Sequence, residues 1–200
     1  MCNRSGTKAR QIQFRHQVCS VHIIPKSLWG TTLNSESGSA RIVSSARDVQ
    51  PKRSPVGEYD QSILCIDCEA SLAPWDNYAY ELLVKAVPTP VFFDGDKPLA
   101  VKFEDFDMFK LRMFFISLLW RMHVTERPMF NRVDVGPYFE KLTLALSAQN
   151  PDLIRELDVV VSRFDDELSD AILGSPKSKL GGVNVYWVHF ARYSSRVKLD

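Results

Sequence analysis

Two segments of the chain hold side chains whose types and spacing could do chemistry. The first contains His22, and an imidazole can take a proton from a water molecule near neutral pH. The second contains Asp60, Cys65, Cys68 and Glu69, which offer two thiols in a Cys-x-x-Cys spacing and two carboxylates. Thiolates at this spacing are zinc ligands, whereas carboxylates bind hard ions such as Mg²⁺. These residue types therefore point to metal-assisted hydrolysis or to a structural metal site.

The order and content of these segments resemble the HNH endonuclease family, which has the ββα-metal fold. The match rests on His-Ile-Ile-Pro at residues 22–25, then a loop, then Leu-Cys-x-x-Cys ending at Cys68, and it covers residues 19–87. The resemblance implies that His22 is the general base that activates water for attack on a phosphodiester. It also implies a catalytic Mg²⁺ or Mn²⁺ ion near Glu69 and Asp60, which would stabilise the charge that builds on the phosphate.

The chain departs from the family pattern at three positions. Val21 stands where the family has a metal ligand, and a valine side chain has no lone pair to offer. Glu69 stands where the family has His or Asn, and Asp60 or Gln61 stands where it has an orienting Asn. Two functions therefore remain open. The first is an HNH-like metal-dependent nuclease or nicking enzyme, and the second is a catalytically inactive zinc-knuckle protein that binds nucleic acid or another protein.

The cysteines predict a structural zinc site whose ligand set is incomplete. Cys65 and Cys68 supply two thiolates, and tetrahedral zinc needs four ligands. Cys2 and Cys19 are the other candidates, and Cys19 with His22 forms an alternative Cys-x-x-His pair. A histidine that binds zinc cannot be the base. The competing interpretation is that all four cysteines are reduced, small core residues.

The net charge of +1 conceals a strong asymmetry along the chain. Residues 1–57 carry nine Lys and Arg side chains against two acidic ones, a net charge of +7, which leaves −6 for residues 58–200. A concentration of cations favours contact with a phosphate backbone, although a solvated loop would explain it equally well. The predicted nucleic-acid contacts are Arg15, Lys26, Arg41, Arg47, Lys52 and Arg53.

The elements that must position the first set of residues form a predicted module over residues 1–87. A β-branched run at residues 19–25 predicts a short strand that Pro25 ends. Residues 31–57 are rich in Ser, Thr, Gly and Pro and predict a long basic loop. A second apolar piece at residues 62–68 closes on the Cys-x-x-Cys, and helical spacing predicts a helix over 74–86.

Residues 88–200 predict a helix-rich accessory domain. Asp94-Gly95 between apolar runs predicts a hairpin, and apolar spacing predicts a central helix over 104–123 whose aromatic run, from Phe103 to Trp120, belongs to the core. Further helices are expected over 137–146 and 151–157. A terminal strand is expected over 183–190, so the whole chain is assigned to the α+β class.

Composition limits the setting in which the protein works. An apolar content of 45% over 200 residues is enough for a core, and the most apolar stretch, residues 113–120, is far too short to span a bilayer. No signal peptide is recognised, and four cysteines are too few for a disulfide framework. We therefore expect a soluble, cytoplasmic protein. Similar arrangements in bacterial and phage proteins are compatible with a role in host defence or counter-defence.

Overall fold

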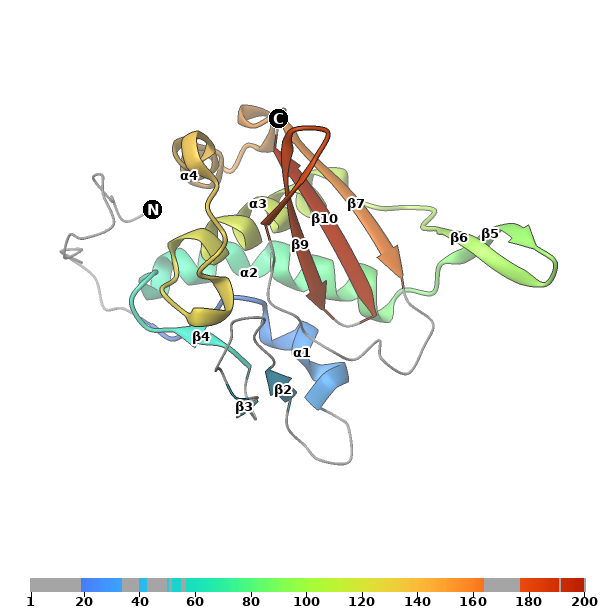
Figure 1. Cartoon of the computed structure of the whole chain (residues 1–200), viewed down its shortest axis with the longest axis horizontal. Coiled ribbons are helices and arrows are strands. Elements are labelled where there is room, and N and C mark those ends of the chain that lie inside the picture. The colour runs from blue at the N-terminus through green and yellow to red at the C-terminus, as the bar shows by residue number, and fades with distance from the viewer. Residues whose placement is uncertain are drawn as a thin grey trace.

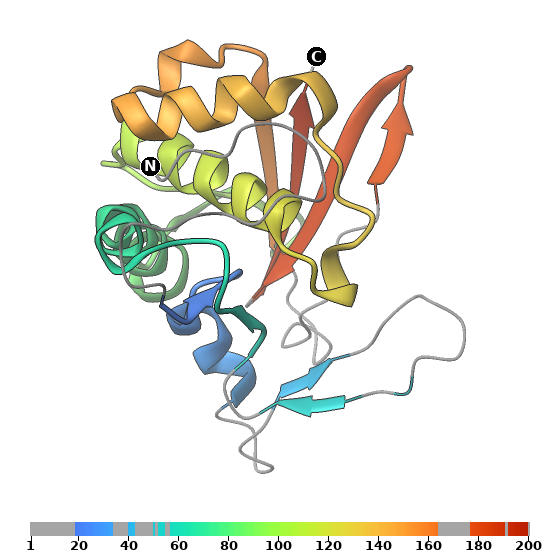
Figure 2. The ribbon, with the colours of Figure 1, turned by 90° about the vertical axis from the view of Figure 1, so that its left-hand side faces the viewer.

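The protein is an α+β structure in which helices cover one face of an antiparallel sheet (Figures 1 and 2). The computed structural model describes residues 19–33, 40–42, 50, 52–54, 57–163, 177–190 and 192–199. In Figure 2 the helices α2, α3 and α4 lie on one side and the sheet on the other, with α3 in the middle. The helices are α1 (Lys26–Leu33), α2 (Ile66–Tyr80), α3 (Met108–Val124) and α4 (Phe139–Ala148).

The sheet contains four antiparallel strands in the order β7-β10-β9-β8. Gly181 and Gly182 both have positive φ, at 61° and 88°, which suits the two-residue turn between β8 and β9. The sheet strands are β7 (Leu157–Arg163), β8 (Lys177–Leu180), β9 (Val183–Phe190) and β10 (Tyr193–Leu199). The expected strand over 183–190 is confirmed. The helix expected over 151–157 is wrong, because only Pro151–Leu153 forms a 3-10 turn and Leu157 already pairs with Leu199 of β10.

Helix α3 confirms the central helix expected over 104–123. Its first turn is capped by Asp107, whose Oδ1 accepts from the backbone N–H of Lys110 at 3.0 Å. From Met113 to Met122 every side chain of the helix is buried. The prediction that the whole aromatic run is core is wrong at its beginning. Phe106 and Phe109 are 44% and 47% exposed, because this end of α3 extends beyond the helices and sheet that cover the rest.

Helix α2 begins eight residues before the predicted start at Pro74. Cys65 is its N-cap, with an extended backbone and a sulfur that accepts from the N–H of Cys68. Pro74 therefore lies inside the helix, where burial of Leu72 and Trp75 on its core side offsets the missing hydrogen bond. The helix continues as a π-helix over Glu81–Lys85.

Helix α1 begins directly after Pro25, and Trp29 within it is fully buried, donating from Nε1 to the Ile24 carbonyl at 2.9 Å. The loop expected over residues 31–57 is wrong where the structure describes it, because the end of α1 and the strands β2 (Ala40–Ile42) and β3 (Lys52–Ser54) lie in that range. These two strands pair with each other. The remaining strands and 3-10 helices are β1 (Val21–His22), β4 (Tyr59–Asp60), β5 (Thr89–Asp94), β6 (Lys97–Lys102), Pro128–Phe130 and Gly136–Tyr138.

One hydrophobic core joins the two predicted parts of the chain. Buried side chains on both sides of the expected boundary at residue 87 belong to a single cluster, which runs from Val21 and Trp29 through Phe114 to Tyr186. The residues before position 87 are therefore held in place by α3 and by the sheet. None of the described helices is long and apolar enough to cross a membrane.

Candidate functional site

Strands β1 and β4 bring the two chemically interesting segments together. They pair antiparallel, with Val21 opposite Asp60 and His22 opposite Tyr59. Helix α2 begins a few residues later, at Ile66, so the described order is strand, insertion, strand and helix. The segments that contain His22 and Asp60 are thus adjacent in space.

His22 and Val21 differ in what they present to solvent. The imidazole of His22 is half-buried, and its centroid lies 6.2 Å from that of the Tyr59 ring. The side chain of Val21 is fully buried in the core. The position at which the resemblance implies a metal ligand is therefore a packing position in this protein.

Asp60 uses both of its carboxylate oxygens inside the fold. Oδ1 accepts from the N–H and hydroxyl of Ser62 at 2.9 and 2.7 Å, and Oδ2 accepts from the Thr125 hydroxyl at 2.6 Å. Burial by itself raises the pKa of Asp60, but the bonds from Thr125 and Ser62, with the charge of Arg127, outweigh burial and lower it. The carboxylate is held ionised as a structural acceptor that joins β4 to the end of α3.

Glu69 lies in the first turn of α2 and is half-buried. Its Oε2 is buried without a hydrogen-bond partner in the described structure. Burial raises the pKa of Glu69, and the nearby Asp76 raises it further, while Arg121 acts in the opposite direction. Of the two carboxylates that were predicted to lie near a metal ion, Glu69 is the one with an oxygen that accepts no hydrogen bond in the described structure.

The described cysteines lie near one another without forming a metal centre. The Cys65 sulfur is buried and accepts from the Cys68 N–H at 3.4 Å, while the Cys19 thiol donates to the Leu64 carbonyl at 3.8 Å. Burial, followed by the charges of Glu69, Cys65 and Cys68, raises the pKa of the Cys19 thiol. Among the described residues no three His, Cys, Asp or Glu side chains form a group that could hold a metal ion.

The predicted metals are therefore not supported by the described donor set. Cys19, Cys65 and Cys68 do not converge into a zinc site, and Asp60, Glu69 and His22 do not converge into a Mg²⁺ or Mn²⁺ site. Cys2 lies outside the described residues. Zinc binding by Cys65 and Cys68 stays a prediction.

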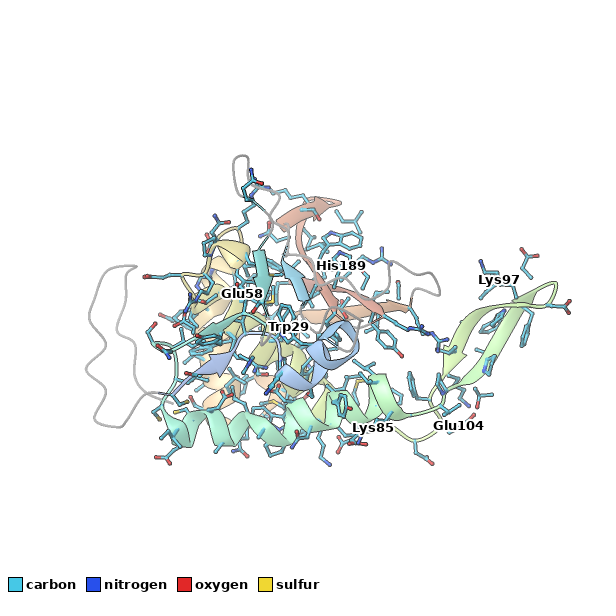
Figure 3. The ribbon with its side chains drawn as sticks, turned by 90° about the horizontal axis from the view of Figure 1, so that it is seen from below. Trp29, Glu58, Lys85, Lys97, Glu104 and His189 are labelled. Atoms are coloured by element: carbon cyan, nitrogen blue, oxygen red, sulfur yellow. The ribbon has the colours of Figure 1, made fainter. Side chains whose placement is uncertain are left out.

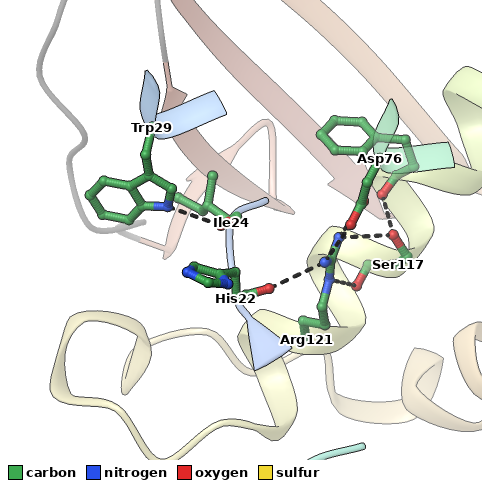
Figure 4. Close-up of polar contacts among 7 residues, drawn as sticks. His22, Ile24, Trp29, Asp76, Ser117 and Arg121 are labelled. Carbon is green, nitrogen blue, oxygen red and sulfur yellow. Dashed lines mark hydrogen bonds and ion pairs between the residues drawn. The ribbon is translucent and has the colours of Figure 1, made fainter. Parts of the chain in front are cut away.

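Arg121 connects the elements of the site, and sequence reasoning missed it. The side chain is fully buried in α3 and forms a bidentate ion pair with Asp76 of α2, at 2.9 and 2.7 Å (Figure 4). Nη1 also donates to the His22 carbonyl at 3.2 Å, and Nε and Nη2 donate to the carbonyl and hydroxyl of Ser117. One guanidinium thus ties β1, α2 and α3 together. The available signal was an arginine within the most apolar helix, because a buried cation requires a partner.

The predicted nucleic-acid residues are only partly described. Lys26 is exposed at the start of α1. The backbone register of β2 and β3 sets Arg41 opposite Arg53 and Lys52 opposite Ile42, so three of the predicted cations share one short ribbon. Arg15 and Arg47 lie outside the described residues. The structure adds one cation that sequence reasoning missed, Arg127, whose guanidinium lies 5.7 Å from the centre of the Tyr59 ring.

The pKa of Glu69 predicts a specific dependence of stability on pH. Because the folded state raises this pKa, the folded protein holds the proton more tightly than the unfolded chain does. The contribution of this carboxyl to stability is present below its unfolded pKa and is lost as pH rises through its folded pKa. Glu69→Gln should therefore increase the free energy of unfolding at pH 7, and the gain should shrink towards pH 4.

Urea unfolding of wild type and Glu69→Gln across this pH range measures the effect. Asp67→Asn, which changes an exposed carboxyl in the same helical turn, is the matched control and should not produce the same pH-dependent gain. A Glu69→Gln protein that is less stable than wild type at pH 7 would show that the ionised carboxylate has a stabilising partner.

Comparison of the chain with protein-family models, with curated proteins and with solved structures found no match.

Proposed function

We propose that this chain is a nucleic-acid-binding protein built on an HNH-like ββα frame that has lost phosphodiester hydrolysis. The observation that carries the proposal is the state of Asp60 beside His22, because both carboxylate oxygens are engaged by Ser62 and Thr125. An oxygen that satisfies the fold is a poor ligand for an incoming cation. Val21, opposite Asp60, is packed in the core. Strands β1 and β4 are thus retained, but the side chains at the positions of the metal ligands, Val21 and Asp60, pack in the core and form hydrogen bonds within the fold.

The cationic side chains near β1, β4 and α2 support the part of the proposal that concerns nucleic-acid binding. Arg41, Lys52 and Arg53 belong to the β2–β3 ribbon, and Lys26 begins the helix next to it (Figure 1). Arg127 lies against Tyr59, the strand partner of His22. Lysine and arginine side chains displace the counterions of a phosphate backbone, and that release drives sequence-independent binding. We infer that the ligand is the backbone of a nucleic acid.

Binding should weaken steeply with salt and depend on the ribbon. The triple variant Arg41→Gln/Lys52→Gln/Arg53→Gln should bind a duplex oligonucleotide at least about tenfold more weakly than wild type. The slope of log affinity against log salt concentration should be less steep by up to about 2.7, because each lost phosphate contact contributes about 0.9 to that slope. Fluorescence anisotropy with a labelled duplex between 50 and 200 mM salt measures both quantities.

The matched control removes three exposed cations that lie outside the ribbon, Lys85→Gln/Lys141→Gln/Lys179→Gln, and should leave affinity nearly unchanged. Figure 3 shows Lys85 near the end of the helix that leads into the hairpin β5–β6. If the control variant lost as much affinity as the ribbon variant, binding would reflect overall charge rather than this surface.

One observation favours the competing function, an active nuclease. The buried Oε2 of Glu69 has no hydrogen-bond partner in the described structure, and such an oxygen could accept a cation. A plasmid-nicking assay with Mg²⁺ or Mn²⁺ separates the two functions. We expect wild type and His22→Ala to leave supercoiled plasmid equally intact. Nicking by wild type that His22→Ala abolishes would establish catalysis and overturn the loss of hydrolysis.

A further inference from the structure

Two thiols, those of Cys65 and Cys68, lie in the first turn of α2. Cys65 is the N-cap residue, and its sulfur accepts from the Cys68 N–H at 3.4 Å. Its carbonyl accepts from the Glu69 N–H at 2.9 Å, which is the first regular hydrogen bond of the helix. Both cysteines are reduced in the described structure. The start of the helix therefore holds the two residues in a fixed relation.

The spacing of the two residues suits a disulfide between their sulfurs. Residues three apart in an α-helix have Cα atoms about 5 Å apart. A disulfide spans Cα separations of about 4.4–6.8 Å. The Cys65 sulfur already lies 3.4 Å from the Cys68 nitrogen, which is one bond from the Cα that carries the Cys68 side chain. Formation of the bond therefore needs rotation of side chains and no rearrangement of the helix.

The same pair is poorly suited to the zinc ion that the sequence predicts. Tetrahedral zinc needs four ligands. Among the described residues, no further His, Cys, Asp or Glu side chain joins the pair in a group that could hold a metal ion. The thiol of Cys19 is directed at the Leu64 carbonyl, to which it donates at 3.8 Å. A disulfide, by contrast, requires only the two sulfurs of the pair.

Cys19 lies near the pair but differs from it in reactivity. Burial raises the pKa of the Cys19 thiol, and the charges of Glu69, Cys65 and Cys68 raise it further. The backbone N–H of Cys19 donates to the Leu64 carbonyl at 3.2 Å, which fixes this residue beside the start of α2. The thiolate is the form of cysteine that attacks a disulfide, so we expect Cys19 to react slowly.

The two cysteines of the pair differ in their access to solvent. Cys65 is 1% exposed, whereas Cys68 is partly exposed. A reagent in solution therefore reaches the sulfur of Cys68 first. Cys65 is placed to react second, with a sulfur that is already bonded to a reagent at Cys68.

We propose that Cys65 and Cys68 form a reactive dithiol that exchanges with low-molecular-weight disulfides and closes reversibly to an intramolecular disulfide. The Cys68 thiolate attacks one sulfur of an external disulfide, RSSR, forms a mixed disulfide and releases RS⁻. The Cys65 thiolate then attacks the Cys68 sulfur, forms the bond between the two cysteines and releases the second RS⁻. The protein loses two electrons and two protons, and the external disulfide takes up both to become two RSH. This reactivity is independent of nucleic-acid binding.

Oxidised glutathione is the probe that tests the reaction. The full-length chain with Cys2→Ser, reduced and treated with a chelator, should lose two hydrogen atoms per chain in its intact mass. Peptide mapping should place the disulfide between Cys65 and Cys68. In the same background Cys65→Ser should stop with one glutathione on Cys68, and Cys68→Ser should react at least about tenfold more slowly. Serine is a strong N-cap residue, so Cys65→Ser keeps the start of α2.

Cys19→Ser in the same background is the matched control. It should form the Cys65–Cys68 disulfide as fast as the protein that retains Cys19, because the proposed exchange does not use this thiol. A disulfide that includes Cys19, or the absence of any intramolecular disulfide, would overturn the proposal.

Comparison with the unfolded chain shows whether the fold adds to the Cys-x-x-Cys spacing. In buffers of reduced and oxidised glutathione, the ratio of disulfide to dithiol should be at least about tenfold higher for the folded chain than in urea, because the helix holds the two residues near each other. Equal ratios would contradict the proposal. One equivalent of zinc should leave the ratio of the folded chain unchanged, and a fall in that ratio would show that the pair holds zinc instead.

Discussion

Asp76→Asn should reduce the free energy of unfolding by about 3–5 kcal/mol, because it leaves a buried guanidinium without its counter-charge. The side chains of Arg121 and Asp76 are 0% and 13% exposed, and the two groups meet in bidentate geometry. Asparagine keeps the shape of aspartate but not its charge. Chemical denaturation monitored by circular dichroism measures the loss.

Glu81→Gln is the matched control for this prediction. It breaks the ion pair with Lys85 in the π-helix that continues α2, where the two side chains are 59% and 53% exposed. Water and salt screen such a pair, so we expect the loss to be a small fraction of that caused by Asp76→Asn. Similar losses in the two variants would mean that Arg121 does not depend on Asp76 for its burial.

A double replacement separates the ion pair from the packing around it. Asp76→Leu/Arg121→Met removes both charges, and apolar residues of similar volume can replace a buried pair at little cost. The double variant should therefore be more stable than Asp76→Asn, although the carbonyl of His22 loses a donor. The same variant should weaken binding of nucleic acid if Arg121 positions β1 for that function.

Gly57→Ala should reduce the free energy of unfolding by about 2–4 kcal/mol, from two additive causes. Gly57 has φ of +79°, which an alanine adopts at a cost of about 1–2 kcal/mol. A Cβ at this position would also lie only 2.6 Å from Cε2 of Trp29, whose side chain is fully buried. Trp29 is fixed by its bond to the Ile24 carbonyl, so it cannot move away easily.

Gly95→Ala separates the two causes. Gly95 has φ of +60° at the hairpin turn, and nothing lies within 4 Å of a Cβ built there. This variant should lose only the backbone contribution, about 1–2 kcal/mol. Urea unfolding followed by tryptophan fluorescence compares the two proteins. Equal losses would show that the core around Trp29 accommodates a methyl group.

Elements with strong local patterns could be predicted before any coordinates were known. The Asp94-Gly95 pair set the hairpin turn, and apolar spacing located α3 to within a few residues. The α+β class also followed from the sequence. These features depend on preferences of neighbouring residues, so a sequence pattern is enough to reveal them. The second apolar piece expected at residues 62–68, however, is not a strand: β4 lies before it at Tyr59–Asp60, and α2 begins within it at Ile66.

The elements that sequence reasoning missed depend on partners distant along the chain. A helix was expected over residues 151–157, but it stops after the 3-10 turn Pro151–Leu153, and Leu157 begins β7, which β10 pairs with over its full length. Pro74 was expected to begin a helix, but the Cys65 cap and the packing of Trp75 carry α2 through it. Local preference is a weak term, and tertiary packing outweighs it.

The candidate site shows the same division. The sequence by itself brought His22, Asp60 and Glu69 forward as functional candidates, since their types and order are visible in one dimension. Only the tertiary structure decided that Asp60 is occupied by Thr125 and that Arg121 holds β1 through the His22 carbonyl. Whether a polar atom has a hydrogen-bond partner depends on residues that folding brings close together, and the amino-acid sequence does not give those distances.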